Sequence, residues 1–163
     1  MIAITGTQLA AHAVGDYVFQ SDWMAATKTQ KSVAALAHVV TYTVAFVPLA
    51  STWTNLGWNP VTWVPTAISW QALLFILVTH FIIDRWRLAR YVCWAKNWLA
   101  PKWLTLPATD SEMLPKPVRN WPWAACTGTG YGPDKQPWMA VWLMIITDNT
   151  LHILCNGAAL TWL

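Results

Sequence analysis

All four histidines of this 163-residue chain lie in long apolar stretches, and three of them have an aspartate four residues away. The three pairs are His12 with Asp16, His80 with Asp84, and Asp148 with His152. On a helix, residues four apart share one face with their Cβ atoms about 5–6 Å apart, so each pair could offer an imidazole and a carboxylate to one metal ion. The fourth histidine, His38, lies in the uncharged run 33–50. This pattern predicts a metal site built by several helices.

The composition predicts a membrane protein. The chain is 56% hydrophobic and only 10% charged, with 14 tryptophans, whereas about a quarter of an average soluble domain is charged. Four segments approach the length of about 20 apolar residues that crosses a bilayer, at 2–19, 33–50, 63–83 and 138–163. We therefore expect an all-α, polytopic membrane protein, a bundle of about four transmembrane helices forming a single domain over 1–163.

The first segment is the weakest of the four because glycines and polar residues interrupt it. A cleavable signal peptide is the alternative for this segment. The missing basic region before it and the carboxylate of Asp16 inside it argue against that alternative.

The ten Lys and Arg residues fall in two regions, Lys28 with Lys31, and 85–135. The positive-inside rule places both regions in the cytoplasm and both termini outside. The neutral, tryptophan-containing segment 51–64 then becomes an outer interfacial turn. The Pro-rich stretch at about 99–137 becomes a cytoplasmic insertion loop that cannot be one continuous helix.

Energetics favour a bound cation. One aspartate at the centre of a bilayer costs roughly 2.5–3.5 kcal/mol on insertion scales, and a divalent ion would offset that charge. One or two ions are compatible with the number of ligands, and imidazole-rich sites favour Zn, Mn or Fe over Mg. The predicted ligands are His12, Asp16, His38, His80, Asp84, Asp148 and His152.

Three alternatives use the same residues without a metal centre. The His and Asp side chains could form a hydrogen-bonded network between helices, a proton or ion relay, or a bis-histidine haem site. Carboxylates one turn from the histidines argue against haem, because they are poor walls for a macrocycle.

If the site is catalytic, the chemistry would be metal-dependent hydrolysis. A bound ion lowers the pKa of a water molecule, Asp148 is a candidate base, and Arg85 and Arg87 are candidates to hold an anionic substrate such as a lipid or lipid-linked phosphate. We expect membrane lipids as partners, a homo-oligomer as an option, and no nucleic acid. The second hypothesis is a non-enzymatic membrane protein.

Several motifs together resemble one family. They are His12-Ala-Val-Gly-Asp16, Gln20, Met24-Ala, Lys28, His38, His80-Phe-Ile-Ile-Asp84 and Asp148-Asn-Thr-Leu-His152. The chain resembles the DUF3307 family of bacterial and phage integral membrane proteins of unknown function, with a more distant similarity to membrane-bound metal-dependent hydrolases. Asn149 stands where the family pattern has Gln, and the Pro-rich insertion departs from that pattern. The resemblance implies a multi-pass protein of the bacterial inner (cytoplasmic) membrane.

Overall fold

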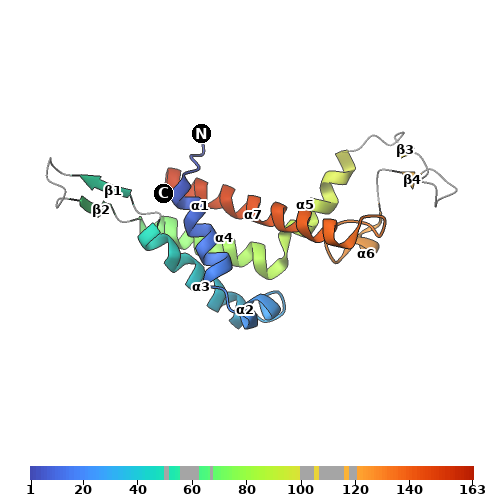
Figure 1. Cartoon of the computed structure of the whole chain (residues 1–163), viewed down its shortest axis with the longest axis horizontal. Coiled ribbons are helices and arrows are strands. Elements are labelled where there is room, and N and C mark those ends of the chain that lie inside the picture. The colour runs from blue at the N-terminus through green and yellow to red at the C-terminus, as the bar shows by residue number, and fades with distance from the viewer. Residues whose placement is uncertain (50–51, 56–62, 67, 100–104, 107–115, 118–120) are drawn as a thin grey trace. The chain divides into compact units, whose positions relative to one another are not determined.

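The computed structural model describes all residues of 1–163 except 50–51, 56–62, 67, 100–104, 107–115 and 118–120. The chain divides into two compact units (Figure 1). Unit 1 consists of Met1–Trp86 and Thr150–Leu163, and unit 2 consists of Arg87–Asn149. The helix α7 (Pro137–Trp162) contributes residues to both units. The single domain expected over 1–163 stays a prediction.

Unit 1 is built from helices whose starts are set by capping side chains. The hydroxyl of Thr5 accepts a hydrogen bond from the backbone N–H of Gln8, and the hydroxyl of Ser21 accepts one from Met24. The helical elements of unit 1 besides α7 are α1 (Gly6–Ala13), the π-helical segment η1 (Val14–Val18), α2 (Asp22–Thr27), α3 (Ser32–Leu49) and α4 (Trp70–Trp86).

The core of unit 1 is centred on aromatic and small side chains between α1, α3, α4 and the end of α7. Tyr42, Phe46 and Ile76 are fully buried there and pack with alanines of α1, α4 and α7. Gly15 in η1 permits this packing, because a Cβ at that position would lie 2.5 Å from the Tyr42 Cδ2 atom. A small residue before Asp16 therefore lets the chain approach α3 closely.

Short antiparallel strands form two pairs within the described residues. In the first pair β1 (Thr52–Asn55) runs against β2 (Trp63–Thr66), with Thr52 opposite Thr66. In the second, β3 (Thr105–Leu106) pairs with β4 (Lys116–Pro117). The remainder of the outer turn expected at 51–64, and much of the insertion expected at 99–137, lies outside the described residues.

Unit 2 begins at Arg87, whose left-handed backbone (φ 50°, ψ 53°) separates α4 from α5 (Leu88–Lys96). A 3₁₀ turn (Asn97–Leu99), α6 (Trp123–Cys126) and the first half of α7 complete its helices. The Arg87 Nη2 atom donates to the carbonyl of Gly128 at 3.1 Å, and the Arg90 Nη1 atom donates to that of Thr127 at 3.1 Å. These bonds hold the glycine-containing turn against α5.

The expectation of about four spanning helices requires correction. Among the described residues only α7, with 26 residues, is long and apolar enough to cross a membrane. The apolar part of α3 covers 17 residues, Ser32–Pro48, and α4 also has 17. At 1.5 Å per residue these helices are about 26 Å long, less than the roughly 30 Å of a hydrocarbon core. The first predicted segment divides into α1 and η1, and the third loses Trp63–Thr66 to a strand.

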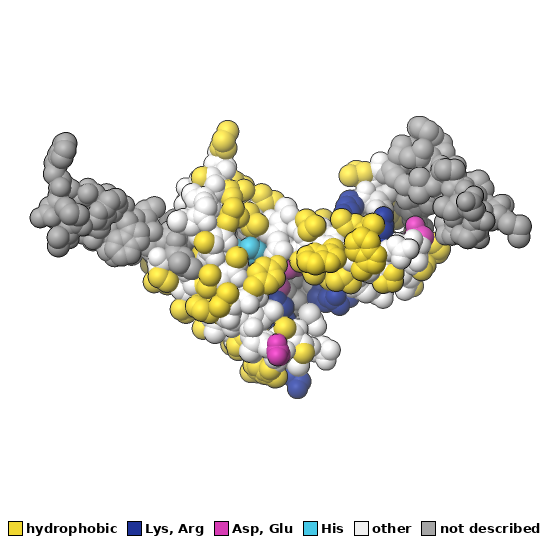
Figure 2. Space-filling model, viewed as in Figure 1, with side chains coloured by type: hydrophobic (Ala, Val, Ile, Leu, Met, Phe, Trp, Pro, Cys, Tyr) yellow, Lys and Arg dark blue, Asp and Glu magenta, His cyan; other side chains and the backbone are white. Residues whose placement is uncertain are grey.

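Besides its apolar core, unit 1 buries several polar side chains and exposes many large apolar ones. Large apolar residues on α3 face outward, including Val33, Leu36 and Val44, and α4 exposes Trp70 and Leu74. Figure 2 shows such hydrophobic side chains over the face in view. The buried polar residues are Gln8, His12, Asp16, His38, Thr43, His80, Asp84, His152 and Asn156.

Candidate metal centre

The buried polar residues of unit 1 form stripes along its helices with a four-residue spacing. Such a spacing places side chains one above another on one helix face. The stripes are Gln8, His12 and Asp16 on α1 and η1; His38 and Tyr42 on α3; His80 and Asp84 on α4; and His152 and Asn156 on α7. The four faces meet inside unit 1, so the residues are brought together by helix packing.

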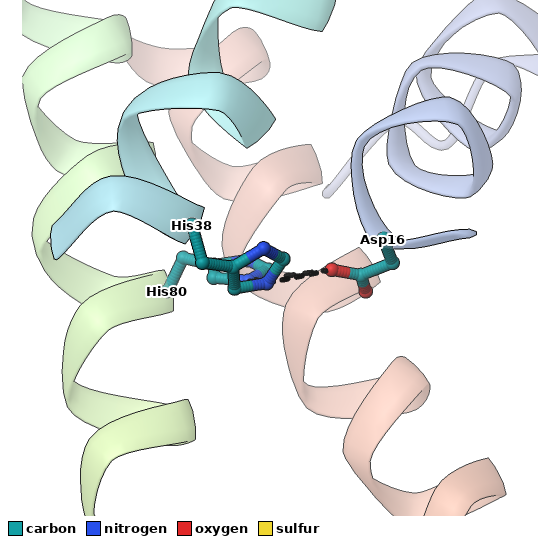
Figure 3. Close-up of side chains that lie close together, drawn as sticks. All are labelled: Asp16, His38 and His80. Atoms are coloured by element: carbon teal, nitrogen blue, oxygen red, sulfur yellow. Dashed lines mark hydrogen bonds and ion pairs between the residues drawn. The ribbon is translucent and has the colours of Figure 1, made fainter. Parts of the chain in front are cut away.

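Four ligand atoms converge at the centre of this cluster. The His38 Nε2 atom lies 3.0 Å from the His80 Nε2 atom, 3.3 Å from Asp16 Oδ1 and 3.1 Å from Asp84 Oδ2. The His80 Nε2 atom lies 3.4 Å from Asp16 Oδ1 and 3.1 Å from Asp84 Oδ2. Figure 3 shows the two imidazoles from α3 and α4 pointing toward the carboxylate of Asp16. All four side chains are nearly or fully buried.

These separations match the geometry around a small metal ion. Atoms bound about 2.0–2.2 Å from a tetrahedral ion lie about 3.3–3.6 Å from one another, and octahedral neighbours lie about 3.0 Å apart. The five distances above span 3.0–3.4 Å. Imidazoles combined with a carboxylate, as in the group Asp16, His38 and His80, are a donor set typical of Zn, Mn and Fe sites.

His152 extends the cluster from α7. Its Nε2 atom lies 3.8 Å from Asp84 Oδ1, and its ring packs on that of His80 with the centroids 4.0 Å apart. Two overlapping groups of side chains could therefore hold a metal ion: Asp16 with His38 and His80, and His80 with Asp84 and His152. Because His80 belongs to both groups through the same Nε2 atom, which has one lone pair, that atom could bind only one ion at a time.

Lys28 places a positive charge at the edge of the same cluster. Its Nζ atom lies 2.8 Å from Asp84 Oδ2 and 3.3 Å from His38 Nε2, and it donates to Gln20 Oε1 at 2.7 Å. The Lys28 side chain is 17% exposed, whereas that of Asp84 is 3% exposed. The ammonium group therefore lies where the cluster comes nearest to the surface.

A hydrogen-bonded network surrounding the cluster orients the helices. Asn156 donates to the Tyr42 hydroxyl at 2.6 Å, and that hydroxyl bonds the His12 Nδ1 atom at 2.8 Å. His12 Nδ1 also lies 3.4 Å from Asp16 Oδ2. Gln8 crosses to α7, donating to the Ile153 carbonyl at 2.8 Å. Through His12, this network contacts the Asp16 oxygen that does not face His38 and His80.

Ring packing orients the two central imidazoles. The Tyr42 ring lies against the His80 ring, with the centroids 3.7 Å apart. Metal-bound histidines commonly donate their second N–H to a carboxylate or carbonyl. Among the described residues, no hydrogen-bond acceptor reaches the Nδ1 atoms of His38 and His80. Their orientation therefore depends on stacking and on the cluster itself.

The other predicted site residues have different surroundings. His12 is buried beside Asp16 and Tyr42 but belongs to neither group, and neither does the half-buried Asp148. Arg85 donates to the Thr29 carbonyl at 2.7 Å and to the Ser32 hydroxyl at 3.3 Å, which ties α4 to the start of α3. Arg87 makes its hydrogen bonds inside unit 2. The catalytic roles of Asp148 and of both arginines stay predictions.

Sequence reasoning assigned no role in the site to Tyr42, Asn156 or Gln8. A signal for them is present in the sequence, because each stands four residues from a histidine within an apolar segment. Lys28 has no histidine four residues away, although it is one of the residues that carry the family resemblance. It follows α2 in a connector, and only the folded chain brings it to Asp84.

These features define a helical protein with a buried His/Asp cluster able to hold a metal ion. A family model, described as a protein of unknown function (DUF3307), matches residues 4–104. The chain therefore belongs to the DUF3307 family, as the sequence motifs predicted. The matched region contains Asp16, His38, His80 and Asp84, whereas His152 lies beyond it. No curated protein and no solved structure matches the chain.

Proposed function

We propose that this protein is a membrane-embedded, metal-dependent hydrolase that acts on a phosphate ester at the bilayer surface. The observation that carries the proposal is that the Asp16 Oδ1 and Asp84 Oδ2 atoms each lie at ligand-like separations from His38 Nε2 and His80 Nε2. Buried carboxylates and imidazoles brought this close require compensation, and a divalent ion supplies it.

The membrane location is supported by the large apolar side chains that the helices expose. A soluble protein rarely exposes a large continuous apolar surface, yet α3 exposes Val40, Val44 and Val47 and α7 exposes Trp142 and Ile146. We place α7 across the bilayer and the shorter α3 and α4 in its apolar layer. The multi-pass arrangement in a bacterial inner membrane, with both termini outside, is part of this proposal.

The chemistry follows from the ligand types. The imidazoles of His38 and His80 and a carboxylate would hold a divalent ion, which would supply a bound water of lowered pKa as a nucleophile. Asp16 is the more exposed of the two carboxylates, at 10% against 3% for Asp84, so its second oxygen, Oδ2, would be the better placed to exchange a proton with such a water. Asp148 is retained as an alternative base.

One observation favours a second, non-enzymatic function. The Lys28 ammonium lies 2.8 Å from Asp84, and the His38 and His80 nitrogens lie at hydrogen-bonding distance from each other. Such contacts could neutralise the carboxylates without a metal and simply tie the helices together. Metal analysis separates the two functions.

The first experiment is elemental mass spectrometry of protein purified in detergent, without added metal and after loading with Zn²⁺ or Mn²⁺. We expect about one equivalent of a transition metal in the wild type, because both groups that could hold an ion share the His80 Nε2 atom. The variants His80→Gln and Asp84→Asn should lose it. Asp22→Asn, an exposed carboxylate in α2, is the matched control and should retain it.

Activity is then measured as inorganic phosphate released from phosphatidic acid in mixed micelles. If the wild-type protein is folded but binds no metal under either condition, the hydrolase proposal is excluded. The contacts of Lys28 and the histidines would then serve to tie the helices together. Bound metal without release of phosphate from phosphatidic acid would retain the metal centre and exclude this substrate.

A further inference from the structure

The feature that extends the proposed function is Lys28, which lies at the exposed edge of the cluster. Its ammonium contacts Asp84 Oδ2 and is held by Gln20 Oε1. Lys28 cannot coordinate the metal as an ammonium group, because that group has no lone pair. As a cation beside a cation site it competes with the metal for the same carboxylate.

The charges of the cluster reverse when a metal binds. With neutral imidazoles, Asp16, Asp84 and Lys28 together carry a net charge of −1, which attracts a cation. A divalent ion changes that net charge to +1. The carboxylate that held the ammonium is then engaged by the metal, and Lys28 keeps its bond to Gln20 as an anchor. A site of this charge, with the partly exposed Lys28 at its edge, attracts an anion.

We infer that Lys28 is the anion-binding residue of the metal centre, and that it holds the phosphate group of a ligand next to the ion. The inference rests on the proposed metal site and names the ligand chemistry: a phosphate monoanion or dianion, either free or at the end of a lipid. Binding is ordered, with the metal first and the anion second. Arg85, the predicted anion-binding residue in this unit, is engaged by Thr29 and Ser32.

The test uses full-length protein in detergent with Mn²⁺ as the metal and inorganic phosphate as the probe. Electron paramagnetic resonance of free Mn²⁺ measures metal affinity, and ³¹P relaxation measures phosphate bound beside Mn²⁺. The variants are Lys28→Met and Lys28→Arg, with Lys31→Met as the matched control because Lys31 is an exposed lysine in the same connector. The ³¹P relaxation measured with the variant His80→Gln, which should not bind Mn²⁺, gives the contribution of Mn²⁺ and phosphate in solution and is subtracted.

We expect Lys28→Met to bind Mn²⁺ several-fold more tightly, because a competing cation is removed, and to bind phosphate at least about tenfold more weakly, because a charge-assisted contact is lost. Lys28→Arg should retain phosphate binding, and Lys31→Met should behave as wild type. A merely structural role for Lys28 would instead weaken metal binding in the Met variant.

Three outcomes overturn the inference: equal phosphate affinity in Lys28→Met and wild type, phosphate binding of equal strength without Mn²⁺, or weaker Mn²⁺ binding in Lys28→Met. Absence of Mn²⁺ binding by the wild type overturns the proposed function as well, so the two failures are distinguishable. Nanodiscs containing phosphatidic acid identify the source of the anion. If nanodiscs containing phosphatidic acid displace the bound phosphate and phosphatidylcholine nanodiscs do not, the site binds a lipid headgroup. If neither kind of nanodisc displaces the phosphate, the site binds free phosphate.

Discussion

At the scale of single residues, the cluster combines side chains that are costly to bury separately. Burying an unpaired carboxylate costs several kcal/mol, and the structure places the carboxylates of Asp16 and Asp84 against imidazoles and Lys28. The residues around the cluster control its geometry through contact. Gly15 and Tyr42 are the clearest examples, because one adjoins Asp16 and the other packs on His80.

Gly15→Ala should destabilise unit 1 by about 1–3 kcal/mol, the usual cost of forcing an extra methyl group into a packed site. The added Cβ would lie 2.5 Å from the Tyr42 ring. Because Asp16 follows directly, metal affinity should fall as well. Gly6→Ala is the control, since a Cβ there meets nothing within 4 Å. Unfolding in detergent and metal titration measure both effects, and equal stability of the two variants would contradict the close packing.

Tyr42→Phe removes a hydroxyl that contacts both Asn156 and His12 but keeps the ring that packs on His80. The free energy of unfolding should fall by about 1–3 kcal/mol, because buried polar partners lose a hydrogen bond. The metal stoichiometry should be unchanged. Loss of the metal together with the hydroxyl would show that Tyr42 contributes to the centre itself.

At the scale of elements, the four-residue polar stripes and the break at Arg87 matter most. η1 is π-helical and contains Asp16, which agrees with the frequent occurrence of π-helical turns at functional sites. Arg87 holds a left-handed conformation that costs a non-glycine residue about 1–2 kcal/mol. Its side chain bonds Gly128 and Met144 in compensation.

Comparing Arg87→Ala with Arg87→Gly separates these two contributions. Both variants lose the side-chain bonds, but glycine adopts positive φ without strain. Arg87→Ala should therefore unfold about 1 kcal/mol more easily than Arg87→Gly. The midpoint of thermal unfolding measures the difference. A more stable alanine variant would contradict the left-handed start of α5.

At the scale of the whole molecule, the proposed membrane location rests on the outward apolar residues of the helices and on α7, which is long and apolar enough to cross a membrane. The cluster is assembled from α1, η1, α3, α4 and α7, which are far apart in the sequence. The proposed function depends on this arrangement, because a bilayer would shield the centre from water on most sides. Among the described residues of the cluster, Lys28 and Asp16 are more exposed than Asp84, His38 and His80.

The sequence by itself determined the helical class, the family and the set of histidines and aspartates. Four-residue spacing and apolar surroundings are local properties of the sequence, so they do not depend on how the helices pack. The positions of α3 and α7 also followed from hydropathy, within about a residue at each end.

Only the tertiary structure decided which of those side chains meet. Asp16, His38, His80, Asp84 and His152 come together, whereas His12 and Asp148 lie in neither group that could hold a metal ion. Spacing fixes a residue's face on its own helix but not the depth and rotation at which helices pack. The same reason explains why Lys28 was not assigned to the site. Its contact with Asp84 spans 56 residues of sequence, and no local pattern encodes such a contact.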